Sequence, residues 1–176
     1  CLTDFYRAAV DDPILGPLAQ AYRGLKPPRY PTLFETLVNA FACQQVTLSL
    51  GIQLLNRLAA ACAPSLDGID GPAFAFPNPA DLAGRAPDEL RALGFSRQKA
   101  RAIIELADAI TLHRLDIDEL ERQDDATAMA RLLAWRGVGR WTAEYVLLRG
   151  LGRLHVFPGD DVGARNNLQR WLGLLE

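Results

Sequence analysis

Hydrophobic residues recur with a helical period along most of the chain, and the alternation typical of half-buried strands is almost absent. Within residues 32–43, TLFETLVNAFAC, the apolar positions fall on one face, and Thr32 is a candidate N-cap. Ser96 has the same place before a later periodic segment. The segment 64–80 is rich in Pro, Gly and Asp and predicts a loop. We therefore expect an all-α chain, with helices near residues 32–43, 47–62, 97–112, 125–134, 140–149 and 162–172, and short helices near 87–92 and 116–121.

The composition is that of one globular domain, which we assign to residues 1–176. The chain is 49% hydrophobic and 23% charged, so it has enough apolar material for a buried core. Its three cysteines, at positions 1, 43 and 62, have no C-x-x-C spacing, which disfavours a disulfide scaffold and a zinc site. No apolar run approaches membrane-spanning length. These features predict an intracellular, for example cytoplasmic, protein.

The net charge of −2 is unusual for a protein that binds nucleic acid. The average hides a strong local asymmetry, however. Residues 131–153 contain five arginines and the single acid Glu144, a local charge of +4, whereas residues 115–130 contain six acids and one arginine, a local charge of −5. The arginine-rich stretch predicts a basic face that could bind phosphate whatever the total charge.

The most informative stretch is residues 132–150, LLAWRGVGRWTAEYVLLRG. The pattern predicts that one helix stops at Gly137, that Val138 packs into the core, and that the chain turns at Gly139 into a second helix. Glycines allow backbone conformations that other residues avoid and let another backbone come close. The first amides of the second helix would then point outward as an anion site, flanked by Arg136 and Arg140.

The segment RGVGRWTAEY, followed by HVFPGDD, resembles the helix-hairpin-helix (HhH-GPD) DNA glycosylase superfamily. It is most similar to the alkylation-repair branch, of the 3-methyladenine DNA glycosylase II type. Upstream, DDPILGPLAQAYRGL, FETLVNAFACQQVTLSLG and LRALGFSRQKARAI match this branch in order and spacing, so the resemblance covers roughly residues 10–172. It implies a helical domain that acts in base-excision repair on double-stranded DNA with damaged bases.

Asp160 and Asp161 form an acidic pair before a predicted helix, where a lone aspartate is usually an N-cap. We expect one of the two to cap the helix and the other to face a cleft. The resemblance assigns catalysis to Asp161, at the end of a loop over residues 155–161. Cleavage of an N-glycosidic bond builds positive charge on the deoxyribose, which a fixed carboxylate stabilises. The same carboxylate can orient or deprotonate the attacking water.

Trp141 stands where the lyase-type members of the superfamily carry a lysine. A lysine attacks the sugar and forms a Schiff base, which tryptophan cannot do, so the resemblance implies a monofunctional enzyme that uses water. Trp141 and Tyr145 are one helical turn apart on the same face. Without the resemblance they are as readily explained as core aromatics. With it, they are candidate walls of a base pocket, because aromatic faces attract the cationic rings of alkylated purines.

The remaining site residues follow from the resemblance. Gln44 and Gln45 lie between two predicted helices, and the resemblance points to Gln45 as the wedge that fills the gap left by a flipped nucleotide. It also implies a monovalent cation, Na⁺ or K⁺, held by hairpin carbonyls, and no iron–sulfur cluster, because no cysteine follows Cys62. The expected carbonyl donors are Leu133, Trp135 and Val138, and the expected DNA contacts are Gln44, Gln45, Arg136, Gly137, Val138, Gly139, Arg140 and Thr142.

Three titratable residues are given structural roles. We expect His155 to be a loop histidine, His113 a charge at a helix C-terminus, and Lys99 a surface or phosphate contact.

Three functions stay open from the residues alone: an alkylbase glycosylase, a hairpin module that grips DNA without catalysis, and a mismatch-directed glycosylase. The chain ends fifteen residues after Asp161, so we expect it to lack the C-terminal helices of its relatives. It would then be a piece of a longer protein or associate with a second copy, because apolar surface would be uncovered. The candidates for that surface are Leu33, Leu37, Phe41, Leu168, Trp171 and Leu172.

Overall fold

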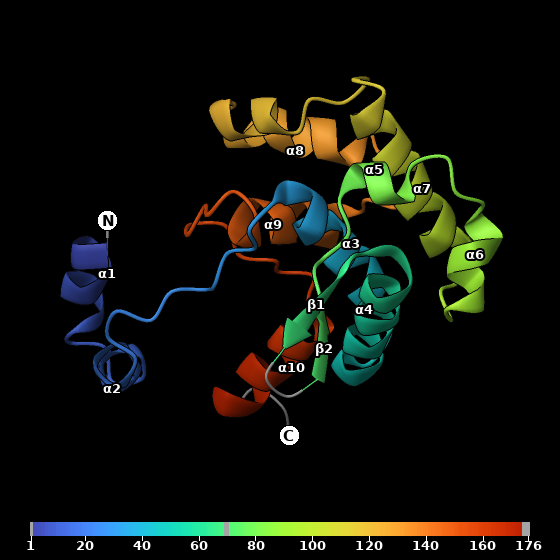
Figure 1. The fold of residues 1–176 in the computed structure, drawn as a ribbon. Helices are drawn as coiled ribbons and strands as arrows, with labels where there is room; N and C mark the ends of the chain where they lie inside the picture. Colours follow the sequence, from blue (N-terminus) through green and yellow to red (C-terminus); the bar gives the residue numbers. More distant parts are fainter. Residues whose placement is uncertain (1, 69–70, 174–176) are drawn as a thin grey trace.

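The structure is a computed structural model that describes residues 2–68 and 71–173. Nearly all of its regular structure in that part of the chain is helical, as predicted (Figure 1). The elements are α1 Leu2–Ala9, α2 Leu15–Ala21, α3 Leu33–Cys43, α4 Leu48–Cys62, β1 Ser65–Gly68, β2 Gly71–Phe74, α5 Pro79–Leu82, α6 Pro87–Ala92, α7 Arg97–Thr111, the 3₁₀ helix η1 Asp118–Arg122, α8 Asp125–Leu133, α9 Arg140–Arg149 and α10 Val162–Trp171.

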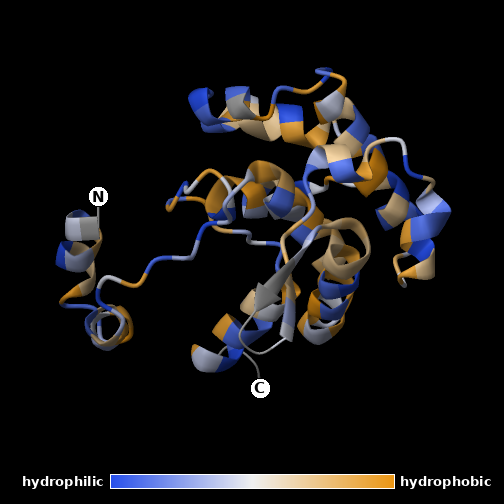
Figure 2. Ribbon diagram, in the orientation of Figure 1, coloured by the Kyte–Doolittle hydropathy of each residue, from blue (hydrophilic) through white to orange (hydrophobic). Residues whose placement is uncertain are grey.

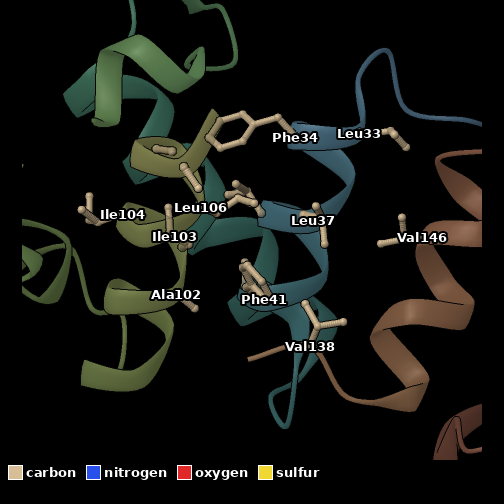
Figure 3. Packing of buried hydrophobic residues seen from close by; sticks show 14 of the residues in the cluster. Leu33, Phe34, Leu37, Phe41, Ala102, Ile103, Ile104, Leu106, Val138 and Val146 are labelled. Carbon is tan, nitrogen blue, oxygen red and sulfur yellow. The ribbon is translucent and has the colours of Figure 1, made fainter. Parts of the chain in front are cut away.

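Helix α3 lies at the centre of the core, between α7 and α9 (Figure 3). Its sequence carries apolar side chains around most of its circumference, so it can be covered on several sides. Leu33, Leu37 and Phe41 are only 6%, 2% and 2% exposed, which overturns the expectation that they form uncovered apolar surface. Helices α7 and α9, far along the chain, supply the cover. In Figure 2 the outer helices α4 and α7 carry hydrophobic and hydrophilic positions side by side, as amphipathic helices do.

The helix starts follow the capping residues. The Thr32 hydroxyl accepts a hydrogen bond from the Glu35 amide, and the Ser96 hydroxyl accepts one from the Lys99 amide, so both predicted N-caps are confirmed. Helices α4, α8 and α10 also have a side-chain N-cap, from Thr47, Asp124 and Asp161. Helix α9 differs from these because its N-cap residue, Gly139, has no side chain that could accept a hydrogen bond.

The segment 64–80 is not simply a loop, which corrects the prediction. Strands β1 and β2 pair antiparallel, from Ser65 opposite Phe74 to Gly68 opposite Gly71. The Pro, Gly and Asp residues correctly signal a chain reversal, but the residues beside it pair as a ribbon. Strand β2 is exposed along its whole length, so no apolar alternation was needed and none marked the strand.

Helices α1 and α2 were not predicted. They pack on each other, with Ala9 buried and the Tyr6 hydroxyl accepting a hydrogen bond from the Gly24 amide. Figure 1 shows the pair set apart from the other helices and joined to them by an extended segment. Proline at positions 27, 28 and 31 explains that extended segment. Two short helices that bury little beyond one alanine carry a weak periodic signal, so the pattern missed them.

Helix α10 leaves apolar side chains in solvent. Leu168, Trp171 and Leu172 are exposed, as expected from the sequence. In the described part of the chain, no helix is both long enough and apolar enough to cross a lipid bilayer.

Candidate active site

The hairpin differs from its sequence reading at one end. Helix α8 ends at Leu133, close to the end of the expected helix 125–134 and before Gly137, and a turn over residues 134–137 follows. The Val138 amide donates to the Trp135 carbonyl (3.1 Å), which tightens the turn. Val138 is buried, as predicted, and packs beside Phe41 of α3 (Figure 3). The turn is therefore anchored to the core by one apolar side chain while its flanks stay exposed.

The two hairpin glycines have different roles. Gly137 has a φ of +82°, and a Cβ there would lie 3.0 Å from the Cβ of Ala102 and 3.5 Å from the Phe41 ring. Only glycine fits that position without strain. Gly139 has an ordinary extended backbone (φ −94°), and a Cβ there would meet nothing within 4 Å. Gly137 is thus needed by the fold, whereas Gly139 leaves open space in front of the first amides of α9.

The basic face predicted for residues 131–153 is largely neutralised in the structure. Four of its five arginines pair with carboxylates that are distant in sequence or one helical turn away: Arg131 with Glu119, Arg136 with Glu105, Arg140 with Glu144 and Arg153 with Asp125. Two of these four partners, Glu119 and Asp125, come from the acidic stretch. Exposed ion pairs are weak. The pair between Arg136 and Glu105 is half-exposed on both sides, so Arg136 could exchange its carboxylate for a phosphate.

Part of the predicted site, including Trp141 and Asp161, lines a cleft of about 890 Å³, a volume typical of ligand sites. One wall is the α3–α4 junction, another is the start of α9, and the third is the start of α10. The lining residues are Cys43, Gln44, Gln45, Val46, Thr47, Gly139, Arg140, Trp141, Thr142, Asp160, Asp161, Val162 and Gly163. The other predicted site residues are not among its lining: Leu133, Trp135, Arg136, Gly137, Val138 and Tyr145.

Asp161 is held through both carboxylate oxygens. Its Oδ1 accepts a hydrogen bond from the Ala164 amide (2.8 Å), and its Oδ2 accepts one from Trp141 Nε1 (2.9 Å). The same residue therefore caps α10 and faces the cleft, although the sequence pattern predicted that two aspartates would share these roles. Asp160 also lines the cleft but is exposed. Two fixed donors leave the carboxylate little freedom to rotate.

The loop that leads to Asp161 contacts residues at the start of α8 and just before it. Arg153 donates to the Gln123 carbonyl (2.7 Å) and pairs with Asp125. His155 lies in this loop, as predicted, and also contacts Asp125. The Asp161 amide then donates to the Pro158 carbonyl (3.0 Å). These contacts hold the segment 151–161 in one course before α10 begins.

Trp141 and Tyr145 lie on the same face of α9, as predicted, and their rings are stacked with centroids 5.2 Å apart. Only Trp141 is among the residues that line the cleft; Tyr145 lies behind it. The Tyr145 hydroxyl shares a hydrogen bond with the Tyr30 hydroxyl (2.9 Å) and donates to Asn39 Oδ1 (3.4 Å). Burial raises the pKa of Tyr145 above its ordinary value, and the contact with Tyr30 adds to this. The phenol therefore remains protonated and able to donate.

The structure separates the two glutamines of the α3–α4 junction. Gln44 turns inward, and its Nε2 donates to the Gly137 carbonyl (3.0 Å) and to the Thr142 hydroxyl (2.6 Å). Gln45 is exposed and has a left-handed backbone (φ +53°), which is uncommon outside glycine. Gln44 thus joins the junction to the hairpin, while Gln45 presents its side chain at the mouth of the cleft.

Lys99 is neither a free surface charge nor a nucleophile in this arrangement. Its Nζ donates to the carbonyls of Ala42 (2.9 Å) and Gln44 (2.7 Å) and so caps the C-terminal end of α3. Burial lowers the pKa of Lys99. His113 follows the end of α7, as expected. Among the described residues, no group of three or more His, Cys, Asp and Glu side chains is placed to hold a metal ion.

Gly163 is a site residue that was not predicted from the sequence. A Cβ at this position would lie 3.2 Å from Asp161 Oδ1, so any larger residue would crowd the carboxylate. Its backbone does not require glycine, because its φ is not positive. The only signal was a glycine two residues after the aspartate in the first turn of a predicted helix, where glycine is otherwise unfavourable.

Comparison with known proteins gives one family. Residues 38–176 match the model of the HhH-GPD superfamily of base excision DNA repair proteins. DNA-3-methyladenine glycosylase 2 of Escherichia coli is 37% identical over 151 residues, which cover 84% of this chain and 51% of that protein. The solved structure of a 3-methyladenine DNA glycosylase from Archaeoglobus fulgidus superposes with a TM-score of 0.83 at 27% identity, covering 100% of this chain and 59% of that one.

A second solved structure, 3-methyladenine DNA glycosylase of Schizosaccharomyces pombe in complex with abasic DNA, superposes with a TM-score of 0.76 at 27% identity. It covers 96% of this chain and 79% of that one. The first three curated relatives are covered over 47%, 55% and 51% of their lengths, so the chain spans about half of them. The similarity therefore identifies the family and fold of this stretch.

Proposed function

The chain belongs to the HhH-GPD superfamily of base excision DNA repair proteins, and from that premise we propose that it is a monofunctional DNA glycosylase. Its substrate is a flipped, alkylated base such as 3-methyladenine in double-stranded DNA, and water displaces the base. The observation that carries the proposal is the carboxylate of Asp161, fixed through both oxygens at the wall of an open cleft. The named relatives, which are glycosylases of 3-methyladenine, support the substrate class.

Asp161 acts on the transition state. As the N-glycosidic bond breaks, positive charge grows on the deoxyribose, and a carboxylate already held in place stabilises it without reorganising. The same carboxylate orients the water that attacks the sugar. The N-terminus of α10, whose Ala164 amide donates to Oδ1, favours negative charge at this point. An alkylated purine is a good leaving group because it departs without a negative charge, so the site needs no strong general acid.

Trp141 supports both a base wall and a reaction without the lyase chemistry of a lysine nucleophile. Its indole lines the cleft and can stack on a cationic base. It offers no amine to attack the sugar, and neither lysine of the chain lies in the cleft, because Lys99 caps α3 and Lys26 is in the extended segment before α3. The reaction then proceeds through water and leaves an abasic site.

The hairpin binds the phosphate backbone of DNA. Helix α9 has no side-chain cap, so the amides of residues 139–141 are free to donate to a phosphate at the mouth of the cleft. Gly137, Val138 and Thr142 shape this turn, Arg136 and Arg140 flank it, and Gln45 is placed to fill the gap left by the flipped nucleotide. Phosphate contacts fix the register of the duplex without reading its sequence.

The turn also suits a monovalent cation. Helix α8 ends at Leu133, whose carbonyl belongs to the last turn and so lacks an intrahelical partner. The Trp135 carbonyl accepts one hydrogen bond, from Val138, and has a second lone pair. With the carbonyl of Val138 this is an all-oxygen donor set that fits Na⁺ or K⁺. A cation held there would add positive charge beside a DNA phosphate.

The test is release of free base from methylated duplex DNA by the wild type and by Asp161→Asn. Asparagine is as good an N-cap as aspartate, so the variant keeps α10 while it loses the charge. We expect a loss of at least about 100-fold in the single-turnover rate, with DNA affinity retained. The matched control is Asp160→Asn, a neighbouring carboxylate without these two donors. An inactive Asp160→Asn beside an active Asp161→Asn would show that the wrong carboxylate is assigned. A wild type that binds DNA and releases no alkylated base would refute the glycosylase assignment and favour a non-catalytic binding module.

A further inference from the structure

A short segment before α3 is bonded to the C-terminal end of α9. This strap, residues 28–30, is held in both directions. The Tyr30 amide donates to the Arg149 carbonyl (3.0 Å), and the Arg29 guanidinium donates twice to the Gly150 carbonyl (3.0 and 2.6 Å). In return, Arg149 Nε donates to the Pro28 carbonyl. The strap therefore has a fixed position relative to α9, although it is more than a hundred residues away in sequence.

The side chain of Tyr30 contacts Tyr145 of α9. Its hydroxyl lies 2.9 Å from the Tyr145 hydroxyl, and the Arg149 guanidinium lies over both rings, 5.2 and 5.6 Å from their centroids. The Tyr145 hydroxyl donates onward to Asn39 Oδ1 (3.4 Å), which leaves the Tyr30 hydroxyl as the donor to Tyr145. Tyr145 is thus fixed at its hydroxyl by two elements other than its own.

Tyr145 connects the strap to the carboxylate of Asp161 through Trp141. Its ring stacks on Trp141 at 5.2 Å with an interplanar angle of 24°, and Trp141 Nε1 donates to Asp161 Oδ2 (2.9 Å). A shift of the Tyr145 ring would move the indole along the stack. That motion would lengthen or bend the hydrogen bond that sets the orientation of Oδ2.

We propose that Tyr30, held by the strap, is a positioning residue for Asp161 and acts through Tyr145 and Trp141. The inference rests on the proposed function, since Asp161 is the carboxylate assigned there. Tyr30 lies outside the segment that matches the family model, residues 38–176, and does not line the cleft. It influences the reaction by fixing where the indole stands and not by touching DNA.

The first experiment compares Tyr30→Phe with the wild type. The variant keeps the ring and removes only the hydroxyl. We expect the single-turnover rate of base release to fall about fivefold, the worth of one typical hydrogen bond, while the Kd for duplex DNA is unchanged. Tyr145→Phe also removes the hydrogen bond to Asn39, so it should lose at least as much. The double variant should lose little more than Tyr145→Phe alone, because that change already removes the bond to Tyr30. Tyr22→Phe is the matched control, since Tyr22 is 62% exposed on α2 and should behave as wild type.

The second experiment reads the indole directly and needs no activity. The chain has three tryptophans, so its ¹⁵N correlation spectrum should show three indole signals, and Trp141→Phe identifies the one from Trp141. In Tyr30→Phe we expect the Trp141 indole signal to shift and its proton to exchange faster with solvent. The signals of Trp135 and Trp171 should stay in place, which a general loss of stability would not allow.

The outcomes separate the inference from the proposed function. An unchanged Trp141 signal in Tyr30→Phe overturns the inference, as does a changed signal with an unchanged rate of base release. A changed Trp141 signal in a protein that releases no base supports the strap's hold on the indole and refutes the glycosylase assignment.

Discussion

The two glycines of the hairpin, Gly137 and Gly139, should respond to substitution in opposite ways. An alanine at Gly137 must adopt a φ of +82°, which costs an L-residue roughly 1–2 kcal/mol. Its Cβ would also lie 3.0 Å from the Cβ of Ala102, a crowding of the core that costs about 1 kcal/mol more. We therefore expect Gly137→Ala to lower the free energy of unfolding by about 2–3 kcal/mol. For a chain of this length, that corresponds to a fall in Tm of about 5–10 °C.

Gly139 gives the matched variant. Its backbone is extended and a Cβ there would meet nothing within 4 Å, so Gly139→Val should lower the free energy of unfolding by no more than about 1 kcal/mol, the cost of a poorer N-cap. The valine would, however, stand in front of the amides that are proposed to hold a phosphate. Loss of one hydrogen bond to a charged group corresponds to a fall in DNA affinity of about tenfold or more.

Thermal unfolding followed by circular dichroism measures the first effect, and fluorescence anisotropy with several unrelated duplexes measures the second. Affinity should fall with added salt and should be lost equally for all duplexes, because phosphate contacts carry no sequence information. A Gly137→Ala protein as stable as the wild type would refute the backbone argument. Unchanged DNA affinity in Gly139→Val would refute the proposed contact between the α9 amides and a phosphate. A loss of affinity confined to one duplex would show that the hairpin contacts bases.

Two further predictions concern the chemistry and the wedge. Borohydride should trap no covalent adduct between the protein and abasic or damaged DNA, because Trp141 has no amine; a robust adduct on denaturing gels would direct attention to Lys26 or Lys99. Gln44→Ala should lower the free energy of unfolding by about 1 kcal/mol, because the Gln44 amide is hydrogen-bonded to Gly137 and Thr142. Gln45→Ala should leave stability unchanged and reduce base release. Urea denaturation and single-turnover assays measure the two effects, and the reverse result would exchange the roles of the two glutamines.

The helices of the core could be predicted because their signals are local. Caps such as Thr32 and Ser96 act over three residues, and a periodic apolar face needs only its own sequence. The β1–β2 ribbon and helices α1 and α2 escaped prediction because they bury little, so no apolar pattern was required of them. Short exposed elements are stabilised mainly by backbone hydrogen bonds, which many different sequences can form.

The errors about surfaces have a different cause. Sequence alone cannot say which helix covers another, so the side chains of Leu33, Leu37 and Phe41 were expected in solvent although α7 and α9 cover them. The predicted basic face was largely neutralised for the same reason. Arginines concentrated over residues 131–153 indicate a basic face only if the adjacent acidic stretch lies elsewhere, and the fold brings the two together.

A sequence motif predicts which residues act in catalysis, but it does not show which of them contact each other. A motif gives each position its own role, so Trp141 was interpreted as the residue that replaces a nucleophile and Asp161 as the carboxylate. In the structure these two residues are hydrogen-bonded across twenty positions of sequence, and that contact links their roles. A hydrogen bond to a charged group is worth about 1.5–3 kcal/mol, comparable with a large part of what a single electrostatic group contributes to catalysis. Replacing Trp141 with lysine would therefore not simply add an amine. It would put a flexible ammonium beside Asp161 in place of a rigid donor, and it would remove the ring that Tyr145 and Tyr30 hold in position.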